Sequence, residues 1–481
     1  MNSRLLRELK KLLGPESVLH APEELLLYEY DGSVETGRPE CVVFPRTTTD
    51  VLGIVQLARK HKTPIVGRGS GTGLSGGAIA RHGGIVASFA RMNRIVEIDA
   101  ENQVARVQPG VVNSDLSAAV ADLGLHFAPD PSSQKACTIG GNVSENSGGP
   151  HTLAYGVTTN HVLGLEVVLP TGEVLRLGNS ALDPAGYDLT GLFVGSEGTF
   201  GLVTEITVKL TRLLETVKTL LAIFDSVDDA TETVAEITAR GITPAACEML
   251  DGWTIRAVED YVHAGFPLDC AAILLIDVDG LKEETEAEAA EVGEVCRAHN
   301  AREVRVARNT RERELLWKGR KNAFGAVGRV SPSYYTQDGV IPRTKLPATL
   351  RRIGEIARTY GLQIGNVFHA GDGNLHPIIL FDERDEKQFR DTVAAADEII
   401  AFCVQAGGSI TGEHGVGMEK DRLMPLLFSE ADLELMKRVR AIFNPEGLLN
   451  PGKIFPSTKG CGEIYVRPPR NGNTTPAEKR P

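Results

Sequence analysis

Two histidines flank a tight turn in the stretch Gly-Asn-Val-Phe-His-Ala-Gly-Asp-Gly-Asn-Leu-His, which begins at residue 365. The Asp372-Gly373 pair inside this stretch is a hairpin signal. Apolar and β-branched residues on either side, at 364–368 and 377–381, are typical of the two strands of a hairpin. We therefore expect the turn to bring His369 and His376 towards each other.

A second stretch, Ser-Ile-Thr-Gly-Glu-His-Gly at 409–415, offers a carboxylate and a further imidazole after an expected short strand. Two histidines and one carboxylate are a common open site for a divalent metal. His369, His376 and Glu413 are thus predicted ligands of Zn, Mn or Fe, and His414 would stand beside the metal as a catalytic base. The alternative is that these histidines are ordinary buried or surface polar residues.

Glycines cluster between residues 67 and 201, which is typical of loops whose backbone approaches a ligand. The first cluster, 67–77, follows an expected strand–helix–strand unit and formally matches a dinucleotide fingerprint. That fingerprint needs a helix at its last glycine, and the residues after Gly77 leave no room for one. Backbone N–H groups can still hold a pyrophosphate without a helix. Two further clusters follow at 129–149 and 195–201. Three clusters in one domain favour a binding site for a long ligand, and argue against flexible surface loops.

Length and composition narrow the class of protein. The 481 residues are too many for one core, and 42% hydrophobic with 24% charged residues is typical of a globular chain. A net charge of -12 without a basic stripe argues against nucleic acid as a partner. The seven cysteines form no Cys-x-x-Cys pair, which argues against a disulfide framework and an iron–sulfur cluster. No apolar run approaches membrane-spanning length, so we expect a cytoplasmic protein.

Changes in the residue pattern along the chain suggest its division into domains. We expect an N-terminal helical segment at 1–38, a ligand-binding domain at 39–214 and an α+β domain at 215–416, where longer amphipathic helices alternate with strands. A C-terminal segment follows at 417–456, and the Pro-, Arg- and Asn-rich residues 457–481 are predicted to be a disordered tail.

Several of these motifs together resemble one known family. Pro64-Ile-Val-Gly-Arg-Gly-Ser-Gly-Thr, Thr138-Ile-Gly-Gly-Asn, Leu192-Phe-Val-Gly-Ser-Glu-Gly-Thr-Phe-Gly, His369-Ala-Gly-Asp-Gly-Asn-Leu-His and Gly412-Glu-His-Gly occur in family order. The chain resembles the FAD-linked D-2-hydroxyacid dehydrogenases and oxidases of the vanillyl-alcohol oxidase and p-cresol methylhydroxylase fold. Within them it is similar to the D subunits of bacterial glycolate oxidases.

The resemblance implies an α+β fold in which a two-subdomain FAD-binding domain of the p-cresol methylhydroxylase type carries a ferredoxin-like substrate cap. It also implies oxidation of a small 2-hydroxy acid, with Arg320 and Asn374 holding the substrate carboxylate and His414 as base. The implied FAD contacts are Arg68, Gly69, Ser70, Gly71, Thr72, Ser75, Gly76, Pro129, Asp130, Thr138, Gly140, Gly141, Asn142, Ser144, Asn146, Tyr155, Gly156, Glu197, Gly198, Val203 and Asn450.

Two departures from relatives refine this expectation. Some relatives bind the flavin through a histidine where this chain has Thr72, so FAD is expected to be non-covalent. Relatives that take a dicarboxylate carry a lysine where this chain has Thr336, which favours a small monocarboxylate. Glycolate is the expected substrate. A D-lactate dehydrogenase, a non-catalytic FAD-binding subunit and an NAD-dependent Rossmann dehydrogenase remain as alternatives.

The resemblance also implies where the electrons go. Since the sequence offers no iron–sulfur ligands and no NAD fingerprint that its context supports, they must pass to a quinone, an electron-transfer flavoprotein or a partner subunit. Two partners are implied, a second flavoprotein subunit and an iron–sulfur subunit. Peripheral association with the inner face of the membrane through these partners stays open.

Overall fold

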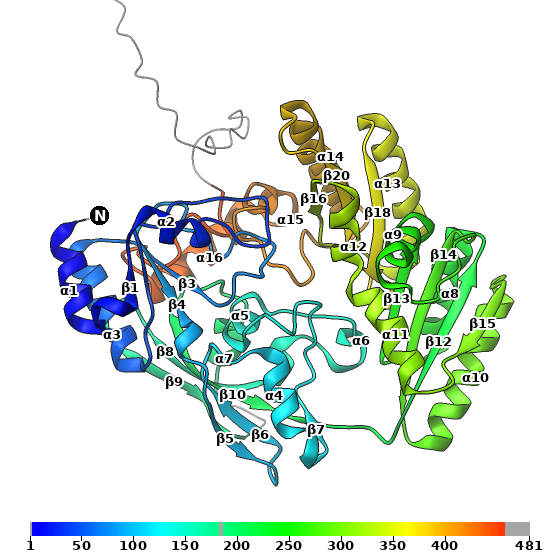
Figure 1. The fold of residues 1–481 in the computed structure, drawn as a ribbon, viewed down its shortest axis with the longest axis horizontal. Coiled ribbons are helices and arrows are strands. Elements are labelled where there is room, and N and C mark those ends of the chain that lie inside the picture. The colour runs from blue at the N-terminus through cyan, green and yellow to red at the C-terminus, as the bar shows by residue number, and fades with distance from the viewer. Residues whose placement is uncertain (1, 182–185, 457–481) are drawn as a thin grey trace, which may run out of the picture.

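Two lobes make up the computed structural model, which describes residues 2–181 and 186–456. One lobe holds the blue to cyan strands of Figure 1 and the other the green to yellow elements. The orange helix α16 (Glu430–Phe443) returns to the first lobe, whereas α15 (Met424–Leu427) packs against α14 (Glu386–Gln405) of the second lobe. The tail expected at 457–481 lies outside the described residues. In the described part of the chain, no helix is long and apolar enough to cross a membrane.

The first lobe begins with the predicted strand–helix–strand unit, formed by β2 (Cys41–Val43), α3 (Thr48–His61) and β3 (Ile65–Arg68). Thr47 caps α3, because its side chain accepts a hydrogen bond from the N–H of Asp50. Both strands pair in parallel with β4 (Ile85–Ser88). The chain leaves the end of β3 directly into the first glycine cluster, which therefore starts from a fixed strand end.

A second sheet in this lobe is antiparallel and has the strand order β5-β6-β10-β8-β9. Along β10 (Leu202–Lys209) buried and half-buried side chains alternate, as expected for a sheet with one covered face. Val168 and Leu202 of this sheet pack into the core beneath the first sheet. This shared core fixes the two sheets relative to each other, and with them the glycine clusters. The strands and helices of this part are β5 (Ile95–Asp99), β6 (Val104–Val107), β8 (Val162–Val168), β9 (Val174–Gly178), α4 (Asn113–Val120), α5 (Ile139–Glu145) and α7 (Leu189–Phe193).

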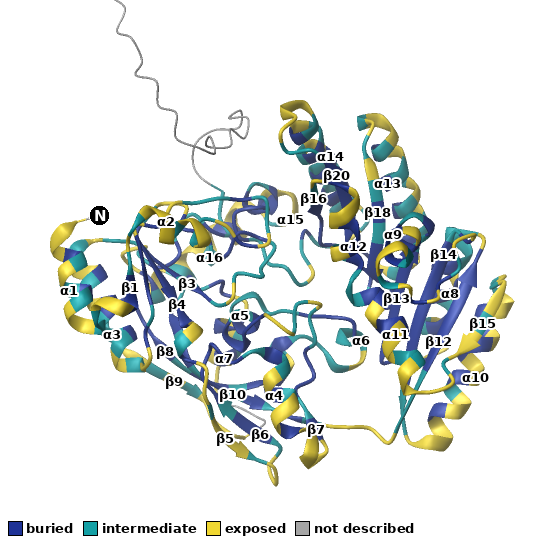
Figure 2. Ribbon diagram, viewed as in Figure 1, coloured by how far each residue is buried: buried dark blue, intermediate teal, exposed yellow. Residues whose placement is uncertain are grey.

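The second lobe is built on a large antiparallel sheet with helices on both faces (Figures 1 and 2). In β12 (Thr216–Phe224) the side chains of 220, 222 and 224 enter one core and those of 221 and 223 enter another. A strand covered on both faces is apolar throughout, which explains the continuous run Leu-Leu-Ala-Ile-Phe. One face is covered by α8 (Val227–Ala239), α10 (Lys282–Ala298), α13 (Leu346–Tyr360) and α14 (Glu386–Gln405), and the other by α9 (Gly252–Val262), α11 (Thr310–Lys321) and α12 (Ala323–Val330).

The sheet of the second lobe positions the predicted hairpin. Strand β18 (Gln363–His369) pairs with β13, and β20 (Pro377–Phe381) returns antiparallel beside β18. The remaining strands of the sheet are β13 (Ala246–Asp251), β14 (Ala272–Gly280), β15 (Glu303–Val306), β16 (Ser333–Thr336), β17 (Gly339–Val340) and β19 (Asn374–Leu375). Short elements elsewhere are α1 (Ser3–Leu13), α2 (Pro22–Leu25), α6 (Thr152–Tyr155), β1 (Val18–Leu19), β7 (Leu125–His126) and β11 (Thr211–Arg212).

Two sequence-based expectations about local structure are wrong. Residues 409–411 are not a strand, and only Ser409 forms an isolated bridge, with Val340. The second glycine cluster is not all loop, because α5 runs through it. Thr138 caps this helix by accepting from the N–H of Gly141, and the apolar residues Ile139 and Val143 lie one helical turn apart and are buried.

Candidate active site between the two lobes

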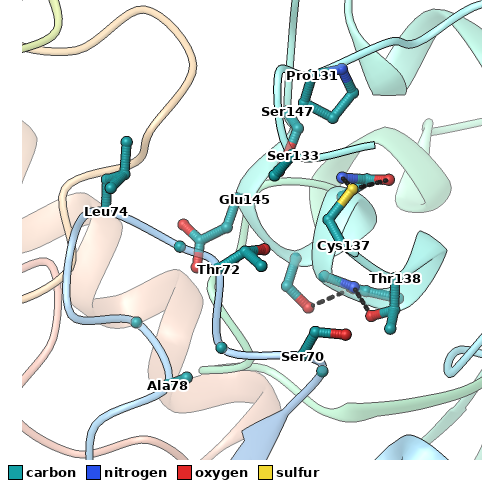
Figure 3. A pocket seen from close by; sticks show the side chains of 18 of the residues that line it. Ser70, Thr72, Leu74, Ala78, Pro131, Ser133, Cys137, Thr138, Glu145 and Ser147 are labelled. Carbon is teal, nitrogen blue, oxygen red and sulfur yellow. Dashed lines mark hydrogen bonds between the residues drawn. The ribbon is translucent and has the colours of Figure 1, made fainter. Parts of the chain in front are cut away.

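One cavity of about 350 Å³ joins the three glycine clusters of the first lobe to His376 and His414 of the second. Figure 3 shows the first cluster, with Ser70 and Thr72, facing Thr138 and Cys137 of the second. The two clusters touch, since a Cβ built on Gly69 would lie 2.4 Å from Oγ1 of Thr138. The predicted cofactor residues that line the cavity are Arg68, Gly69, Ser70, Gly71, Thr72, Thr138, Gly140, Gly141, Asn142, Ser144, Glu197, Gly198 and Val203.

The donor groups in this cavity fit an anionic, ring-bearing cofactor. The guanidinium of Arg68 is buried above the Tyr28 ring, and its Nη1 has no hydrogen-bond partner among the described residues. A Cβ built on Gly73 would meet no atom within 4 Å, so the loop leaves free space there. Buried, unpaired donors are costly unless a ligand satisfies them. FAD, with its phosphates and polar ring edge, can do so.

The other predicted cofactor residues lie outside the lining of this cavity. The carboxylate of Asp130 lies 3.0 Å from Nδ1 of His151 and 3.1 Å from Nζ of Lys321. The Tyr155 hydroxyl donates to Asp279. Asn450 donates through Nδ2 to the carbonyls of Gly77 and Glu197 and so ties the C-terminal segment to two glycine clusters. The remaining residues of this set are Ser75, Gly76, Pro129, Asn146 and Gly156.

The structure brings His369, His376 and Glu413 together. Nε2 of His369 lies 3.2 Å, and Nε2 of His376 3.1 Å, from Oε1 of Glu413. The hairpin achieves this because Gly373 adopts a φ of 79°, a conformation that favours glycine. These three residues each offer one ligand atom, and the three atoms lie within 4.8 Å of one another.

Hydrogen bonds on the far side of each ring fix how the histidines point. Nδ1 of His369 lies 2.7 Å from Oε1 of Glu248, and Nδ1 of His376 lies 3.2 Å from the carbonyl oxygen of Gln337. Both partners only accept, so both Nδ1 atoms donate and both Nε2 atoms face Glu413. Histidines that bind metals in proteins are oriented in the same way.

Asp338 holds the turn that carries Glu413 and His414. Its carboxylate accepts hydrogen bonds from the backbone N–H groups of Gly412 at 3.0 Å, Glu413 at 3.2 Å and His414 at 2.9 Å. Burial raises the pKa of Asp338, but His414 and Lys420 outweigh it and hold that pKa at about 2. Asp338 is therefore an anion that shapes the loop, and the sequence analysis missed it.

His414 differs from the other two histidines. Its ring stacks on His376 with centroids 4.9 Å apart, and its Nε2 is 4.0 Å from Glu413. Its buried Nδ1 has no partner among the described residues. Burial, together with His376 and Lys420, lowers the pKa of His414 to about 4, against the opposing charge of Asp338. A neutral imidazole with a free nitrogen can accept a proton.

The electrostatics of the cluster favour a cation between the carboxylates. Burial opposes the charge on His369, but Glu248 and Glu413 hold its pKa well above the usual range. Burial also opposes the charge on Glu413, yet His369 and His376 hold its pKa well below the usual range. Two buried carboxylates therefore face two cations, the protonated His369 and Arg320, which lies 2.5 Å from Glu248.

The two predicted carboxylate-binding residues lie beside the cluster. Arg320 is 1% exposed, is paired with Glu248 and does not line the cavity. Asn374 is buried against Gly412, and its Oδ1 has no partner among the described residues. The sequence analysis missed Glu145, Lys321, Phe324 and Tyr334, which line the cavity. It also missed Glu248, whose one signal is an acidic residue within the apolar run of β13.

Comparisons with known proteins identify two domain families along the chain. Residues 39–178 match the family described as FAD binding domain, and residues 213–454 match FAD linked oxidases, C-terminal domain. The chain is 46% identical to Glycolate oxidase subunit GlcD of Escherichia coli strain K12, over 93% of this chain and 90% of that protein. It is 42% identical to Glycolate oxidase subunit GlcD of Bacillus subtilis strain 168, over 93% of this chain and 96% of that protein.

Among solved structures, p-cresol methylhydroxylase with substrate bound is similar in fold, with a TM-score of 0.81 and 18% identity over 94% of this chain and 96% of that chain. This confirms the predicted fold class. The matches also confirm the predictions of FAD as cofactor and of an FAD-linked oxidoreductase. The chain belongs to the family of FAD-linked oxidases and is similar to glycolate oxidase D subunits.

Proposed function

We propose that the protein oxidises a small 2-hydroxy acid to the 2-keto acid with FAD, and that glycolate is the substrate, with D-lactate as the nearest alternative. The observation that carries this is the single cavity in which the glycine loops meet His376, Glu413 and His414. The names of the two relatives support the same reaction class. The loops proposed to hold FAD, which accepts the hydride, and the side chains proposed to remove the proton therefore line the same cavity.

His369, His376 and Glu413 are the proposed ligands of a divalent metal, whether Zn, Mn or Fe. Support comes from the converging Nε2 atoms, from the Nδ1 hydrogen bonds behind them and from the two buried carboxylates, Glu248 and Glu413. Two imidazoles and one carboxylate leave open positions for a substrate. When bound, the metal would make the substrate hydroxyl more acidic, and FAD would accept the hydride.

His414 is the proposed base that takes the hydroxyl proton. It adjoins the ligands, is neutral near pH 7 and has a nitrogen without a partner in the described structure. Arg320 and Asn374 are proposed to hold the substrate carboxylate. Support for Arg320 comes from its Nε and Nη1 atoms, which lack hydrogen-bond partners among the described residues. Its side chain must shift to reach the cavity.

Two finer proposals concern the cofactor and the substrate. Non-covalent binding of FAD is supported by Thr72, which lines the cavity and offers no nucleophile comparable to a linking histidine. A monocarboxylate substrate is supported by Thr336, which is buried in β16 and provides no cation for a second carboxylate.

The electrons are proposed to leave through partners, namely a second flavoprotein subunit and an iron–sulfur subunit. The name of the relative, a subunit of glycolate oxidase, supports further subunits in general. A cytoplasmic location is part of the same proposal. The six cysteines in the described residues are free and buried, which fits a reducing compartment.

Anaerobic bleaching of the flavin by a panel of D- and L-2-hydroxy acids, including glycolate and D-2-hydroxyglutarate, tests the function. Rapid bleaching by glycolate is expected, with slower bleaching by larger acids. Faster bleaching by D-lactate would shift the assignment to a D-lactate dehydrogenase. Bleaching by none of the acids would favour a non-catalytic FAD-binding subunit. Reduction by NADH alone would contradict the proposal.

A further inference from the structure

Glu145 is a carboxyl group in the cavity for which the proposed reaction has no use. It is the last residue of α5, and in Figure 3 its side chain reaches from that helix towards the first glycine loop, beside Thr72. Its Oε2 is shielded from solvent and has no hydrogen-bond partner among the described residues. An unpaired polar atom of this kind is costly unless a ligand satisfies it.

Two glycines from distant segments allow the carboxyl group to sit there. A Cβ built on Gly77 would lie 2.3 Å from Oε1 of Glu145, and a Cβ built on Gly415 would lie 2.3 Å from Oε2. The carboxyl group is therefore enclosed between the first glycine loop and the turn that carries His414. This is the end of the cavity where the reacting ring of FAD must lie if His414 is the base.

The charges around Glu145 favour its neutral form. Glu197 lies nearby, and its oxygens accept from the N–H groups of Val416 at 2.7 Å and Gly417 at 2.8 Å, which favour its charged form although burial raises its pKa. Burial, then Glu197 and Asp31, raise the pKa of Glu145 well above its usual range, against Lys453 and Lys420. Its place at the C-terminal end of α5 adds the negative end of the helix dipole.

We propose that Glu145 is a neutral carboxylic acid that donates a hydrogen bond to an acceptor atom of the flavin ring and makes the flavin easier to reduce. A donor stabilises a ring that gains negative charge on reduction. The role is one of positioning and tuning, and no proton leaves Glu145. The inference rests on the proposed function only in placing the ring beside His414.

The test compares Glu145→Gln, Glu145→Ala and, as a matched control outside the cavity, Glu205→Gln, all as FAD-loaded full-length protein. The midpoint potential of the flavin is measured by equilibration with a reference dye and a chemical reductant, so no substrate is needed. Glutamine is neutral and keeps a donor, so its potential is expected to stay close to that of the wild type. Alanine removes the donor and should lower the equilibrium constant for reduction about tenfold, which is about 30 mV for a two-electron couple.

Three results would overturn the proposal. A flavin that is about tenfold or more easier to reduce in Glu145→Gln would mean that Glu145 is an anion. Unchanged potentials in both variants would mean that Glu145 makes no contact with the ring. Loss of FAD affinity in Glu145→Ala with an unchanged potential would place the contact on another part of FAD. The flavin potential is measured without turnover of a substrate. The role of Glu145 can therefore be disproved while the proposed reaction stands, and the proposed reaction can be disproved while the role of Glu145 stands.

Discussion

The carboxylate of Glu248 lies 2.7 Å from Nδ1 of His369, in the middle of a strand where no water reaches it. Its second oxygen lies 2.5 Å from Arg320. One buried anion thus orients a proposed metal ligand and neutralises a buried guanidinium. This links the stability of β13 to the chemistry of the site.

Replacing Glu248 with glutamine should weaken metal binding about 10–100-fold, because the neutral amide offers one acceptor oxygen, which cannot serve both Nδ1 of His369 and Arg320. The free energy of unfolding should fall by about 3–5 kcal/mol, because Arg320 is left buried without its counter-charge. Metal analysis after dialysis and urea unfolding measure the two effects. Asp251→Asn is the control, since Asp251 lies on the same strand but bonds Asn366. Metal retained at the wild-type level by Glu248→Gln would contradict this role.

Gly373→Ala should disrupt the turn that brings the histidines together. A Cβ there would lie 2.2 Å from the carbonyl oxygen of Ile341, in addition to the strain of a φ of 79°. Gly361→Ala is a matched control, because it also has a positive φ, of 65°, but its Cβ would meet no atom within 4 Å. The control should lose about 1 kcal/mol of stability and keep its metal, whereas Gly373→Ala should lose both. Equal metal contents would show that the turn does not set the site.

The hairpin could be predicted from sequence because its information is local. Asp372-Gly373 marks the turn, and apolar strands on either side give the pairing. The same holds for the strand–helix–strand unit that contains α3. The second glycine cluster misled the prediction because glycine is a poor helix former, while burial of Ile139 and Val143 stabilises α5 regardless.

The groups that were missed act across long sequence separations. Glu248 contacts His369 from another strand, and Asp338 holds a turn more than 70 residues away. The residues next to either carboxylate in the sequence do not indicate which distant residue it contacts. The division into domains at 39–214, 215–416 and 417–456 stays a prediction.

Lys453 provides a prediction about pH. It is fully buried, its Nζ donates to the carbonyl of Ile79 and to Asn450, and burial lowers its pKa from 10.5 to about 8. Between pH 8 and 10.5 the folded chain has released this proton while the unfolded chain still binds it. The free energy of unfolding therefore increases as the pH rises. The gain is about 3 kcal/mol. Buried cysteine thiols titrate in the same pH range and lower the stability as the pH rises. The wild type must therefore be compared with Lys453→Met, which has the same thiols.

Urea unfolding of the wild type and Lys453→Met at pH 7.5 and 10 measures this contribution. The stability difference between the two proteins should grow in favour of the wild type as pH rises. A difference that is independent of pH would show that Lys453 titrates normally.

The flavin should be released by acid. Thr72 lines the cavity and offers no imidazole for a covalent link to the flavin, so precipitation with acid should leave the yellow colour in the supernatant. The absorbance of supernatant and redissolved pellet decides this. Colour that stays with the pellet would show a covalent bond.

The most direct test of the account is to compare His376→Ala with His414→Ala, measuring bound metal and the rate of anaerobic flavin bleaching by glycolate in a single turnover. His376 directs Nε2 at Glu413, so its loss should lower bound metal. His414 should be dispensable for metal and FAD, but its loss should slow bleaching about 10²–10⁴-fold. Metal lost from His414→Ala and kept by His376→Ala would reverse the two roles. Unchanged metal and rate in both variants would contradict the account, because the histidines would then be structural.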